Sequence, residues 1–436
     1  MHAPYRGART CDRAVGGPTL PSMSSLRARF EAYWDGSIDP SVEPPMFPVM
    51  AHEEVAERSL FVSSFANVTA LRTDDGLVLV DAGGPLLGAQ VHAAVRSWSD
   101  EPVRAVIYTH GHVDHVVGIE RFEEEQRARG TGEFTVYAHE NVTARFARYA
   151  LTAGYNACIN ARQFQVEVAW PTSFREPDET YRDRRTLELG GEHVELHHAR
   201  GETDDATWVW VPGRKLLCAG DLFIWAAPNA GNPQKVQRFA REWAVALRAM
   251  ATLGAEVMLP GHGLPLYGRE RIAQALTETA ALLTHLHDET LARMNAGMRL
   301  DDIVHEVKAP PELLARPYLR PFYDEPEFIV RNVWRLYGGW WDGEPARLQP
   351  APAVAVAREL CALAGGAEAM AARAEMLAAA GELALASHLI EHAVLAAPGD
   401  AGIAAVRRNV YERRAQAATS LMARGIYTDA ASGRRA

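Results

Sequence analysis

Short runs of hydrophobic residues, separated by polar turns, run through roughly the first 270 positions of the chain. Residues 60–84 contain two apolar runs split by an Asp-Asp-Gly sequence at 74–76, which predicts two strands joined by a hairpin turn. Residues 88–98 have helical spacing, and 104–110 is a short β-rich run. The opening part of the chain is therefore expected to alternate strands with helices.

The same alternation continues after a polar, aromatic-containing segment at 150–185, for which no element is predicted. Glycine pairs and Pro-Gly sequences separate the later runs, as expected for turns between strands. Further strands are predicted within 134–140, 186–199, 207–212, 215–224 and 255–263, and helices within 238–254 and 269–307. This pattern predicts α/β layers with functional loops at strand ends.

The composition changes beyond residue 345. A short proline-containing linker leads into an Ala- and Leu-rich region in which a glycine turn and a Pro-Gly-Asp turn separate helical segments. This region resembles a tetratricopeptide helical hairpin, although one or two units do not establish a repeat array. We interpret it as an α-helical packing or dimerisation module.

Length, charge and cysteine content restrict the class of protein. A chain of 436 residues favours two or three domains, and a net charge of −10 argues against a nucleic-acid partner. The cysteines, Cys11, Cys158, Cys218 and Cys361, form no CxxC pair, which favours free thiols in a reducing compartment.

The N-terminal segment does not resemble a secretion signal, because residues 1–25 contain no apolar core. We expect a disordered leader there, with Met23 as an alternative start of translation. No stretch approaches the ~20 apolar residues of a membrane span. We expect a cytoplasmic protein with no membrane partner.

Potential metal-binding side chains are most concentrated in the sequence YTHGHVDHVVG at 108–118. It places His110, His112, Asp114 and His115 in one short segment directly after a predicted strand. Imidazoles two residues apart on an extended segment can face the same side, and the next two donors follow at the turn. Neutral imidazoles with a carboxylate suit Zn²⁺ or a similar divalent ion. The motif therefore predicts a metal site divided between two adjacent positions.

This motif resembles that of the metallo-β-lactamase-fold hydrolases, and three further segments extend the resemblance. LVLVDAGG resembles the family's early strand, with Asp81 orienting a metal-bound histidine. LCAGDLFI resembles the strand that carries a bridging aspartate, here Asp221, and LPGHG the late loop that carries the last histidine, here His262. The segments occur in the family's order between about 60 and 265. The resemblance implies an αββα sandwich.

One position departs from most of the family and is similar to its alkylsulfatase branch. The segment HARGET at 198–203 places Glu202 where most members have a histidine ligand, with His198 as the alternative. Residues 321–350 resemble an alkylsulfatase segment that ends in Tyr-x-Gly-Trp-x-Asp-Gly-x-Pro, and the helices after about 350 resemble its dimerisation domain. A sterol-carrier-like C-terminal domain, found in full alkylsulfatases, is not expected in this chain. The resemblance implies a homodimer formed through the C-terminal helices.

The resemblance also implies a ligand set for two divalent metal ions. His110, His112 and Glu202 would hold the first ion, Asp114, His115 and His262 the second, and Asp221 would bridge them. Asp114 and Asp221 are also expected to act in catalysis. Zn²⁺ is the expected metal, with Mn²⁺ or Fe²⁺ as alternatives. Such a pair lowers the pKa of a bridging water from 15.7 to about 7, which provides a hydroxide nucleophile.

The substrate implied by this branch is an alkyl sulfate ester. The branch's sulfate-binding arginine is missing from 231–234, where Lys235 or Arg238 could substitute, and Phe223 and Ile224 could line a pocket for an alkyl chain. Alternatives are a lactone, a carboxylic ester or a β-lactam as substrate, or a non-catalytic metal-binding interaction module. The expected substrate-binding residues are Asn156, Asn160, Arg162, Trp225, Arg331 and Tyr337. The alternative is ordinary structural hydrogen bonding for the five others and a core position for Trp225, as for Phe223 and Ile224.

The predicted fold class is α/β, with a metallo-β-lactamase αββα sandwich followed by an α-helical, tetratricopeptide-like dimerisation domain. The predicted parts are a partly disordered leader at 1–45, a catalytic domain at 46–285, a helical connection contributing to the pocket at 286–346, and the dimerisation domain at 347–436.

Overall fold

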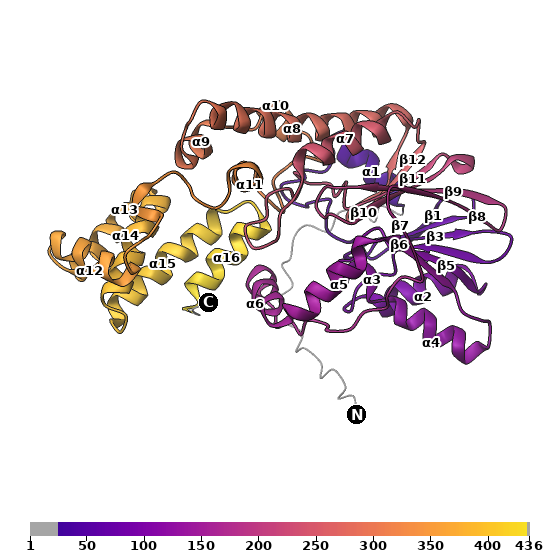
Figure 1. The fold of residues 1–436 in the computed structure, drawn as a ribbon, viewed down its shortest axis with the longest axis horizontal. Coiled ribbons are helices and arrows are strands. Elements are labelled where there is room, and N and C mark those ends of the chain that lie inside the picture. Colours follow the sequence, from indigo (N-terminus) through magenta and orange to yellow (C-terminus); the bar gives the residue numbers. More distant parts are fainter. Residues whose placement is uncertain (1–24, 434–436) are drawn as a thin grey trace.

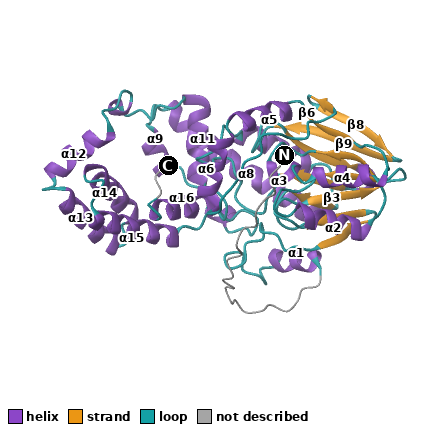
Figure 2. Ribbon diagram, turned by 90° about the horizontal axis from the view of Figure 1, so that it is seen from below, coloured by secondary structure: helices purple, strands orange, loops and turns teal. Residues whose placement is uncertain are grey.

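Two β-sheets pack face to face between residues 52 and 267, with helices against their outer surfaces (Figure 1). The structure is a computed structural model that describes residues 25–433. The helices after residue 299 lie to one side of the sandwich (Figure 2). This arrangement agrees with the predicted fold class.

The first sheet has seven strands in sequence order. Neighbours from β1 to β4 pair antiparallel, whereas β4 to β7 are parallel. The β3–β4 pair is the hairpin predicted around residues 74–76. The strands are β1 (His52–Ala56), β2 (Ser59–Val62), β3 (Val68–Arg72), β4 (Leu77–Val80), β5 (Val103–Ile107), β6 (Thr135–His139) and β7 (Glu179–Tyr181).

The second sheet has six strands in the order β13-β12-β11-β10-β9-β8. Its neighbours pair antiparallel except β11 and β12, which are parallel. The parallel pair matters for the site because both strands end at the same edge. The strands are β8 (Arg184–Leu189), β9 (Glu192–Ala199), β10 (Ala206–Val211), β11 (Leu216–Gly220), β12 (Val257–Pro260) and β13 (Leu266–Tyr267).

Strand β4 shows why the sandwich needs helices on its outside. Its side chains alternate between two hydrophobic cores: Val78 and Val80 belong to the core between the sheets, whereas Leu77 and Leu79 belong to a core that also contains α2 and α4 (Gly88–Trp98 and Ile119–Arg129). Burying each such side chain contributes about 1.5–3 kcal/mol. A strand that is apolar on both faces must therefore be covered on both faces.

The remaining helices of the sandwich include two that the sequence pattern missed. Helix α5 (Asn141–Leu151) follows the strand predicted within 134–140, and helix α6 (Ala153–Phe164) lies in the first half of the polar segment at 150–185. They lie beside the strand ends that carry the candidate site, so they supply many of its surrounding side chains. The others are α3 (Val113–Val116), α7 (Ala240–Ala251), α8 (Arg269–Asn295) and the short 3₁₀ helix Pro212–Arg214.

The region expected to be a leader is partly folded. Residues 1–24 lie outside the described residues, but Leu26–Trp34 forms helix α1, whose Phe30 and Tyr33 are buried in the core between the sheets. The aromatic ring of Phe30 lies 5.5 Å from that of Tyr267 in β13. Residues 26–34 therefore pack with the sandwich, because their apolar positions recur at helical spacing.

The C-terminal helices form their own hydrophobic core and then return to the sandwich. Helices α12 to α15 share a core built mainly from alanine, leucine and isoleucine, and Asp400 of the Pro-Gly-Asp turn caps α15 by accepting a hydrogen bond from Ile403 N. The last helix, α16, lies against α6, where Gln165 Nε2 donates to Gly425 O at 2.9 Å (Figure 2). The helices are α9 (Leu300–Glu306), α10 (Pro311–Leu314), α11 (Pro326–Gly338), α12 (Ala353–Leu363), α13 (Ala367–Ala379), α14 (Leu383–Ala396), α15 (Ala401–Ala417), α16 (Leu421–Ala431) and the 3₁₀ helix Pro345–Arg347.

Two expectations concern the chain as a whole. Cys158, Cys218 and Cys361 are free thiols, whereas Cys11 lies outside the described residues. Among the helices that the structure describes, none has the length and apolarity required to span a bilayer.

Candidate metal centre

The candidate site lies where four strands end. The loop after β5 carries residues 110–115, the loop after β9 carries Glu202, and Asp221 and His262 follow β11 and β12 directly or after one residue. Since β11 and β12 are parallel, the last two side chains start from the same edge of one sheet. The fold thus brings together residues separated by up to 152 positions, from 110 to 262.

Two clusters of metal-binding side chains meet at this edge. Within each cluster the potential ligand atoms all lie within 4.8 Å of one another. We call them group one, consisting of His110, His112, Glu202 and Asp221, and group two, consisting of Asp114, His115 and His262. Together they contain all seven residues that the sequence predicts as metal ligands.

Asp221 is the side chain that connects the two groups. Its Oδ1 lies 3.3 Å from His115 Nε2, and its Oδ2 lies 3.3 Å from His262 Nε2, both in group two. The same Oδ2 lies 3.7 Å from His110 Nε2 in group one. One carboxylate therefore faces both groups, which is the placement expected of a bridging ligand.

The spacing of the other donor atoms also suits shared ions. His112 Nδ1 lies 4.0 Å from Glu202 Oε2, and His262 Nε2 lies 3.7 Å from Asp114 Oδ2. Two ligand atoms that are each about 2.1 Å from one tetrahedral ion lie about 3.4 Å apart. These separations are close to that value and too long for good hydrogen bonds between the same atoms.

Several of these atoms are buried without a hydrogen-bond partner. Among the described residues, His110 Nε2, His115 Nε2 and Asp221 Oδ1 have none, although the three residues are only 0–8% exposed. Buried polar atoms in native proteins are almost always paired, because leaving them unpaired costs free energy. A divalent cation would pair with all three atoms, so the donor set fits the metal that the sequence predicts.

In group two, oxygen acceptors orient both histidine rings. His115 Nδ1 lies 2.7 Å from Asp81 Oδ2, and His262 Nδ1 contacts the Phe65 carbonyl. Donation of the Nδ1 hydrogen to an oxygen leaves the Nε2 lone pair directed at the site. Asp81 is itself held by hydrogen bonds from Thr109 N and Thr109 Oγ1, both 2.7 Å long. This geometry supports the orienting role predicted for Asp81.

In group one, cationic and amide donors hold the carboxylate instead. Glu202 Oε1 accepts hydrogen bonds from Arg238 Nη1 at 2.5 Å and from Asn229 Nδ2 at 2.7 Å, so Oε2 is the oxygen that faces His112. Arg238 is 3% exposed and also donates to Asn229 O. Arg238 Nη1 is therefore engaged by Glu202 and Asn229, whereas Arg238 Nε is buried without a hydrogen-bond partner among the described residues. Its substitution for a substrate-binding arginine stays a prediction.

His198, the alternative to Glu202, is turned elsewhere. Its ring stacks on that of His139 with the centroids 3.6 Å apart, and its Nδ1 lies 3.1 Å from Ala206 O. Burial lowers the pKa of His198 and of His139, which keeps both stacked rings neutral near pH 7. The geometry favours Glu202 as the group-one ligand.

The histidines of the two groups have opposite electrostatic environments. Burial lowers the pKa of His110 to about 3 and the pKa of His112 well below its usual range, so both are neutral imidazoles, the form that binds metals. Burial alone would lower the pKa of His115 and His262, but the neighbouring carboxylates, Asp221 first and Asp114 with it, together outweigh burial and raise the pKa of both. Group two therefore favours positive charge more strongly than the imidazoles of group one.

Burial and neighbouring charges also shift the pKa values of the buried carboxylates. Burial raises the pKa of Glu202 to about 7, although Arg238 partly opposes the shift. Burial would also raise the pKa of Asp221, but the surrounding histidines, His262 first, lower it well below its usual range. Buried negative charge on this scale is stable only when cations balance it.

Helix α6 places the predicted asparagines near the site but uses part of their hydrogen-bonding capacity internally. Asn156 Nδ2 donates to Thr152 O and Oγ1, and Asn160 Nδ2 donates to Asn156 O at 2.8 Å. Arg162 pairs with Asp429 of α16 at 3.3 Å and donates to Gln234 Oε1. Of these three predicted substrate-binding residues, Arg162 is the one engaged in holding α16 to α6.

Lys235, the other proposed substitute for the missing arginine, has a different environment. Its Nζ donates to Asn160 Oδ1 at 3.1 Å and lies 5.8 Å from the centre of the Trp170 ring. Burial and the charge of Arg238 lower the pKa of Lys235 to about 8, while the charges of Glu202 and Asp114 oppose this shift. One carboxylate from each group thus interacts electrostatically with this ammonium, and no acidic side chain among the described residues forms an ion pair with it.

Three predicted substrate-binding residues do not gather at the centre. Trp225 is 0% exposed and its indole N–H donates to Leu264 O, so it is a core residue, as are Phe223 and Ile224. Tyr337 hydrogen-bonds His287 Nε2 at 3.1 Å. Arg331 is exposed on α11, and among the described residues it forms no hydrogen bond or ion pair with either group. Aromatic residues after a strand and polar residues on a helix gave no information about which way their side chains point.

Tyr323 is a neighbour of the centre that the sequence did not reveal. Its hydroxyl accepts a hydrogen bond from Gln163 Nε2 of α6 at 2.8 Å. Burial raises the pKa of Tyr323 above its usual range, and the charges of Glu202 and Asp114 raise it further. No spacing signal marks this residue, because it lies in an irregular segment before α11.

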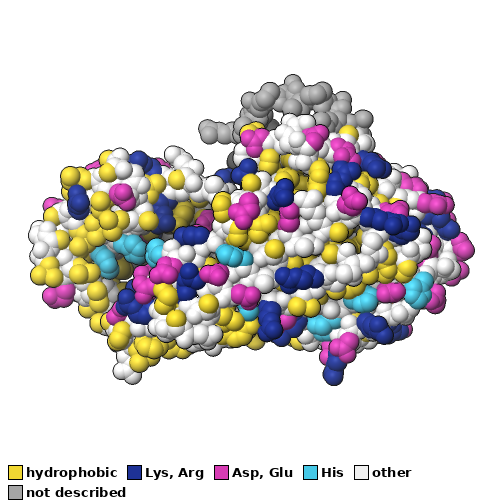
Figure 3. All heavy atoms as spheres, turned by 90° about the horizontal axis from the view of Figure 1, so that it is seen from above, with side chains coloured by type: hydrophobic (Ala, Val, Ile, Leu, Met, Phe, Trp, Pro, Cys, Tyr) yellow, Lys and Arg dark blue, Asp and Glu magenta, His cyan; other side chains and the backbone are white. Residues whose placement is uncertain are grey.

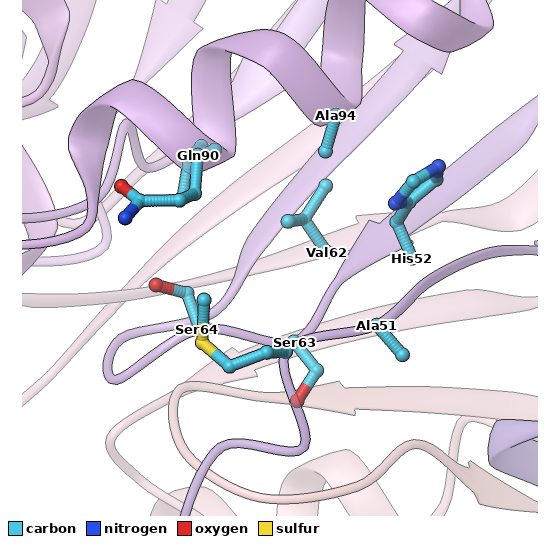
Figure 4. A pocket seen from close by; sticks show the side chains of 9 residues that line it. Ala51, His52, Val62, Ser63, Ser64, Gln90 and Ala94 are labelled. Carbon is cyan, nitrogen blue, oxygen red and sulfur yellow. The ribbon is translucent and has the colours of Figure 1, made fainter.

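A small cavity elsewhere in the sandwich is distinct from this centre. Its volume is about 60 Å³, and its walls include His52, Val62, Ser64, Gln90 and Ala94 (Figure 4). None of the seven ligand residues lines it. The chemistry of the candidate site is therefore identified by its side chains rather than by a large cavity.

Comparison with known proteins agrees with this geometry. Residues 63–262 match the metallo-beta-lactamase superfamily, and residues 299–436 match the alkyl sulfatase dimerisation family. A linear primary-alkylsulfatase from Pseudomonas sp. is 29% identical over 74% of this chain and 65% of its own length. An (R)-specific secondary-alkylsulfatase from Pseudomonas sp. is 26% identical over 83% of this chain and 59% of its own length. The chain thus spans less than two thirds of the length of these relatives.

A solved structure shows the same fold. The stereoselective inverting sec-alkylsulfatase from Pseudomonas sp. superposes with a TM-score of 0.80 at 23% identity, covering 88% of this chain and 66% of that one. The chain therefore combines a metallo-β-lactamase superfamily domain with an alkyl sulfatase dimerisation domain and is homologous to the alkylsulfatases.

Proposed function

We propose that this protein is a metal-dependent hydrolase of alkyl sulfate esters. The observation that carries the proposal is the meeting of group one and group two at Asp221, with Glu202 as the ligand that distinguishes group one. The homologous proteins named as alkylsulfatases supply the substrate class.

The proposed ligands are the seven residues of the two groups. Group one would hold one divalent ion and group two a second, with Asp221 shared. Zn²⁺ is the expected metal because imidazole and carboxylate ligands suit it, and Mn²⁺ or Fe²⁺ are alternatives. When bound, the ions would supply a coordinated water with a pKa near 7 and Lewis-acid contacts to the ester oxygens.

The protein's own residues fix the geometry of this chemistry. Asp81 and the Phe65 carbonyl direct the group-two histidines, while Arg238 and Asn229 leave Glu202 a single oxygen for the centre. Pre-set ligand orientation avoids reorganisation during the reaction, which is a main source of catalytic power. The expected catalytic role of Asp114 and Asp221 rests on their place in these groups.

Lys235 is the cation that we assign to the sulfate group of the substrate. Arg238 Nη1 is paired with the Glu202 carboxylate, whereas Lys235 Nζ donates its hydrogen bond to the neutral amide oxygen of Asn160. A half-buried ammonium that interacts electrostatically with Glu202 and Asp114 offers a charge-assisted hydrogen bond to an anionic ester. This assignment favours a sulfate ester over neutral lactones, esters and β-lactams, which need no such cation.

Substrate and metal content provide the test. The purified full chain is incubated with dodecyl sulfate, a secondary alkyl sulfate, a lactone and a cephalosporin, and its bound metals are counted. Release of inorganic sulfate from the two sulfate esters, by a protein that holds two divalent ions, is the expected result. Hydrolysis of only the lactone or the cephalosporin would overturn the substrate, and a metal-free, inactive protein would favour a non-catalytic interaction module.

We also propose that the C-terminal helices join two copies of the chain. The surface of this region exposes apolar side chains (Figure 3), including Leu360, Leu363, Met376 and Leu385. Leu363→Glu should shift sedimentation from dimer to monomer, whereas Leu151→Glu, at a comparably exposed leucine of α5, should leave it unchanged. A cytoplasmic location stays a prediction.

A further inference from the structure

A buried ion pair joins helix α5 to the loop that carries Glu202. Arg145 Nε donates to Asp205 Oδ2 at 2.6 Å and Arg145 Nη2 donates to Asp205 Oδ1 at 2.8 Å, so the pairing is bidentate. Arg145 is 2% exposed and Asp205 0% exposed. Bidentate arginine–carboxylate pairs fix direction as well as distance.

Asp205 also holds the loop that carries the first two histidines. Its Oδ2 accepts a hydrogen bond from Gly111 N at 3.1 Å, and Gly111 is the residue between His110 and His112. Asp205 lies three positions after Glu202. One carboxylate therefore contacts the histidine half of group one directly and belongs to the same loop as its glutamate half.

The ion pair lies so close to Gly111 that a side chain at this position would not fit. A Cβ atom at this position would lie 2.9 Å from Arg145 Cδ and 3.2 Å from Asp205 Oδ2. Both distances are shorter than ordinary van der Waals contact, so the loop backbone lies directly against the ion pair. A shift of the pair would move the backbone that carries the two histidines.

Helix α5 provides a rigid base for this arrangement. Phe146, next to Arg145, is buried in the outer core of the first sheet, and Asn141 Nδ2 donates to Asp204 O at 2.9 Å. Arg145 Nη2 also donates to Asp204 Oδ1 at 2.5 Å. Burial would raise the pKa of Asp205, but Arg145 holds it far below its usual range, so the carboxylate stays charged.

We propose that Arg145 and Asp205 are positioning residues that hold the two halves of group one at metal-binding distance. The proposal rests on the proposed function only in requiring that group one binds a divalent ion. The pair does not contact a ligand side chain. It acts through the backbone at Gly111 and through the short segment from Glu202 to Asp205.

The matched control is a second buried arginine away from the centre. Arg214 pairs with Glu192 at 2.7 Å and donates to Arg58 O and Arg72 O, and its side chain is 8% exposed. None of these partners belongs to group one or group two. Arg145→Met and Arg214→Met therefore remove the same group from comparable surroundings, one beside the centre and one remote from it.

The experiment compares Zn²⁺ binding and stability in the full chain. Wild type, Arg145→Met, Asp205→Asn and Arg214→Met are stripped of metal, titrated with Zn²⁺ against a chromophoric chelator, and unfolded with denaturant in the metal-free state. We expect Arg145→Met and Asp205→Asn to weaken one of two bound ions by about 10–100-fold, the range for residues that orient ligands, and to leave the other ion unchanged. Arg214→Met should lower stability and bind both ions as wild type does.

The isosteric Asp205→Asn variant keeps the test decisive if Arg145→Met does not fold. Two ions bound by Asp205→Asn with wild-type affinity would overturn the proposal, as would equal weakening in Arg214→Met. Zn²⁺ binding does not depend on the substrate. A wild type that binds two ions but hydrolyses no alkyl sulfate would thus overturn the proposed function and leave the positioning role intact, whereas a wild type that binds no ion would overturn both.

Discussion

Group one and group two share Asp221, yet side chains of opposite character hold them in place. In group one, the cation Arg238 donates a hydrogen bond to Glu202, the proposed glutamate ligand. In group two, oxygen acceptors contact the histidine ligands: the Asp81 carboxylate contacts His115, and a backbone carbonyl contacts His262. The carboxylate ligand of group one is thus supported by donors, and the histidine ligands of group two by acceptors.

The difference follows from the ligands themselves. A buried glutamate has a second oxygen that must be paired with a donor, and a positive donor also offsets its charge. A metal-binding imidazole has a second nitrogen that must donate, so it requires an acceptor. If the groups are supported independently in this way, changes in one support should weaken one ion, and only changes at Asp221 should weaken both.

The largest effect is expected for Asp221→Asn. The substitution removes the charge that faces His110, His115 and His262, so both groups lose their shared ligand. Because loss of a supporting residue alone costs about 10–100-fold in metal affinity, both ions should bind more than ~100-fold more weakly. Metal analysis after dialysis measures this, and a variant that retains two ions would contradict the shared role.

The next largest effect is expected for Glu202→Ala. Group one should lose its ion and group two should keep its own. In the metal-free protein, Arg238 loses its buried partner, which lowers the free energy of unfolding by about 3–5 kcal/mol. In the double variant Glu202→Ala/Arg238→Met, stability should recover while the ion stays lost. Unchanged metal content in Glu202→Ala would exclude this ligand.

A smaller effect, on the group-two ion instead of the group-one ion, is expected for Asp81→Asn. An amide in place of the carboxylate weakens the contact to His115 Nδ1 and puts a donor near the Thr109 N–H, which now donates to Asp81. Affinity for the group-two ion should fall about 10–100-fold with the group-one ion unaffected. Asp74→Asn, at an exposed carboxylate of the hairpin turn, is the control for Zn²⁺ titration. Loss from both groups would show that the two supports are not independent.

The smallest effect on the centre is expected for Lys235→Met, which should leave both ions bound. For alkyl sulfates KM should rise about 10–100-fold, because hydrogen bonds to charged groups contribute about 1.5–3 kcal/mol. Lys308→Met, at an exposed lysine, should change nothing. An equal loss on a neutral lactone would contradict an anion-binding role.

The same lysine predicts a pH dependence. Lys235 carries its charge below its pKa of about 8, so kcat/KM for an alkyl sulfate should fall as the pH rises through that value. Bound cations near the ammonium would lower this pKa further and move the fall to lower pH. Lys235→Arg, which stays charged, should remove this limb of the profile, and a profile unchanged in Lys235→Arg would assign the titration to another group.

Much of the fold could be predicted because its signals are local. Helix α2 has the bounds expected from its helical spacing, and the β3–β4 hairpin forms at its Asp-Asp-Gly turn. Helix α5 was overlooked although Val142, Phe146 and Tyr149 recur at helical spacing and are buried. Helix α6 has a weaker apolar period and is stabilised by packing against α16. The sequence left Trp225 open between a pocket wall and the core, and packing places it in the core, since spacing does not reveal which neighbour covers a side chain.

The sequence by itself indicated the candidate metal ligands: the types and spacing of residues 110–115 directly after a strand are a local feature, and resemblance to a known family added the others. It also indicated Asp81 and the exceptional Glu202. Only the tertiary structure decided which side chains neighbour these ligands: Arg238 pairs with Glu202, Arg145 reaches Asp205 across sixty positions, and Lys235 donates to Asn160. The physical reason is that a buried charge takes its partner from whichever element the packing brings within hydrogen-bond distance, and no local pattern records that choice.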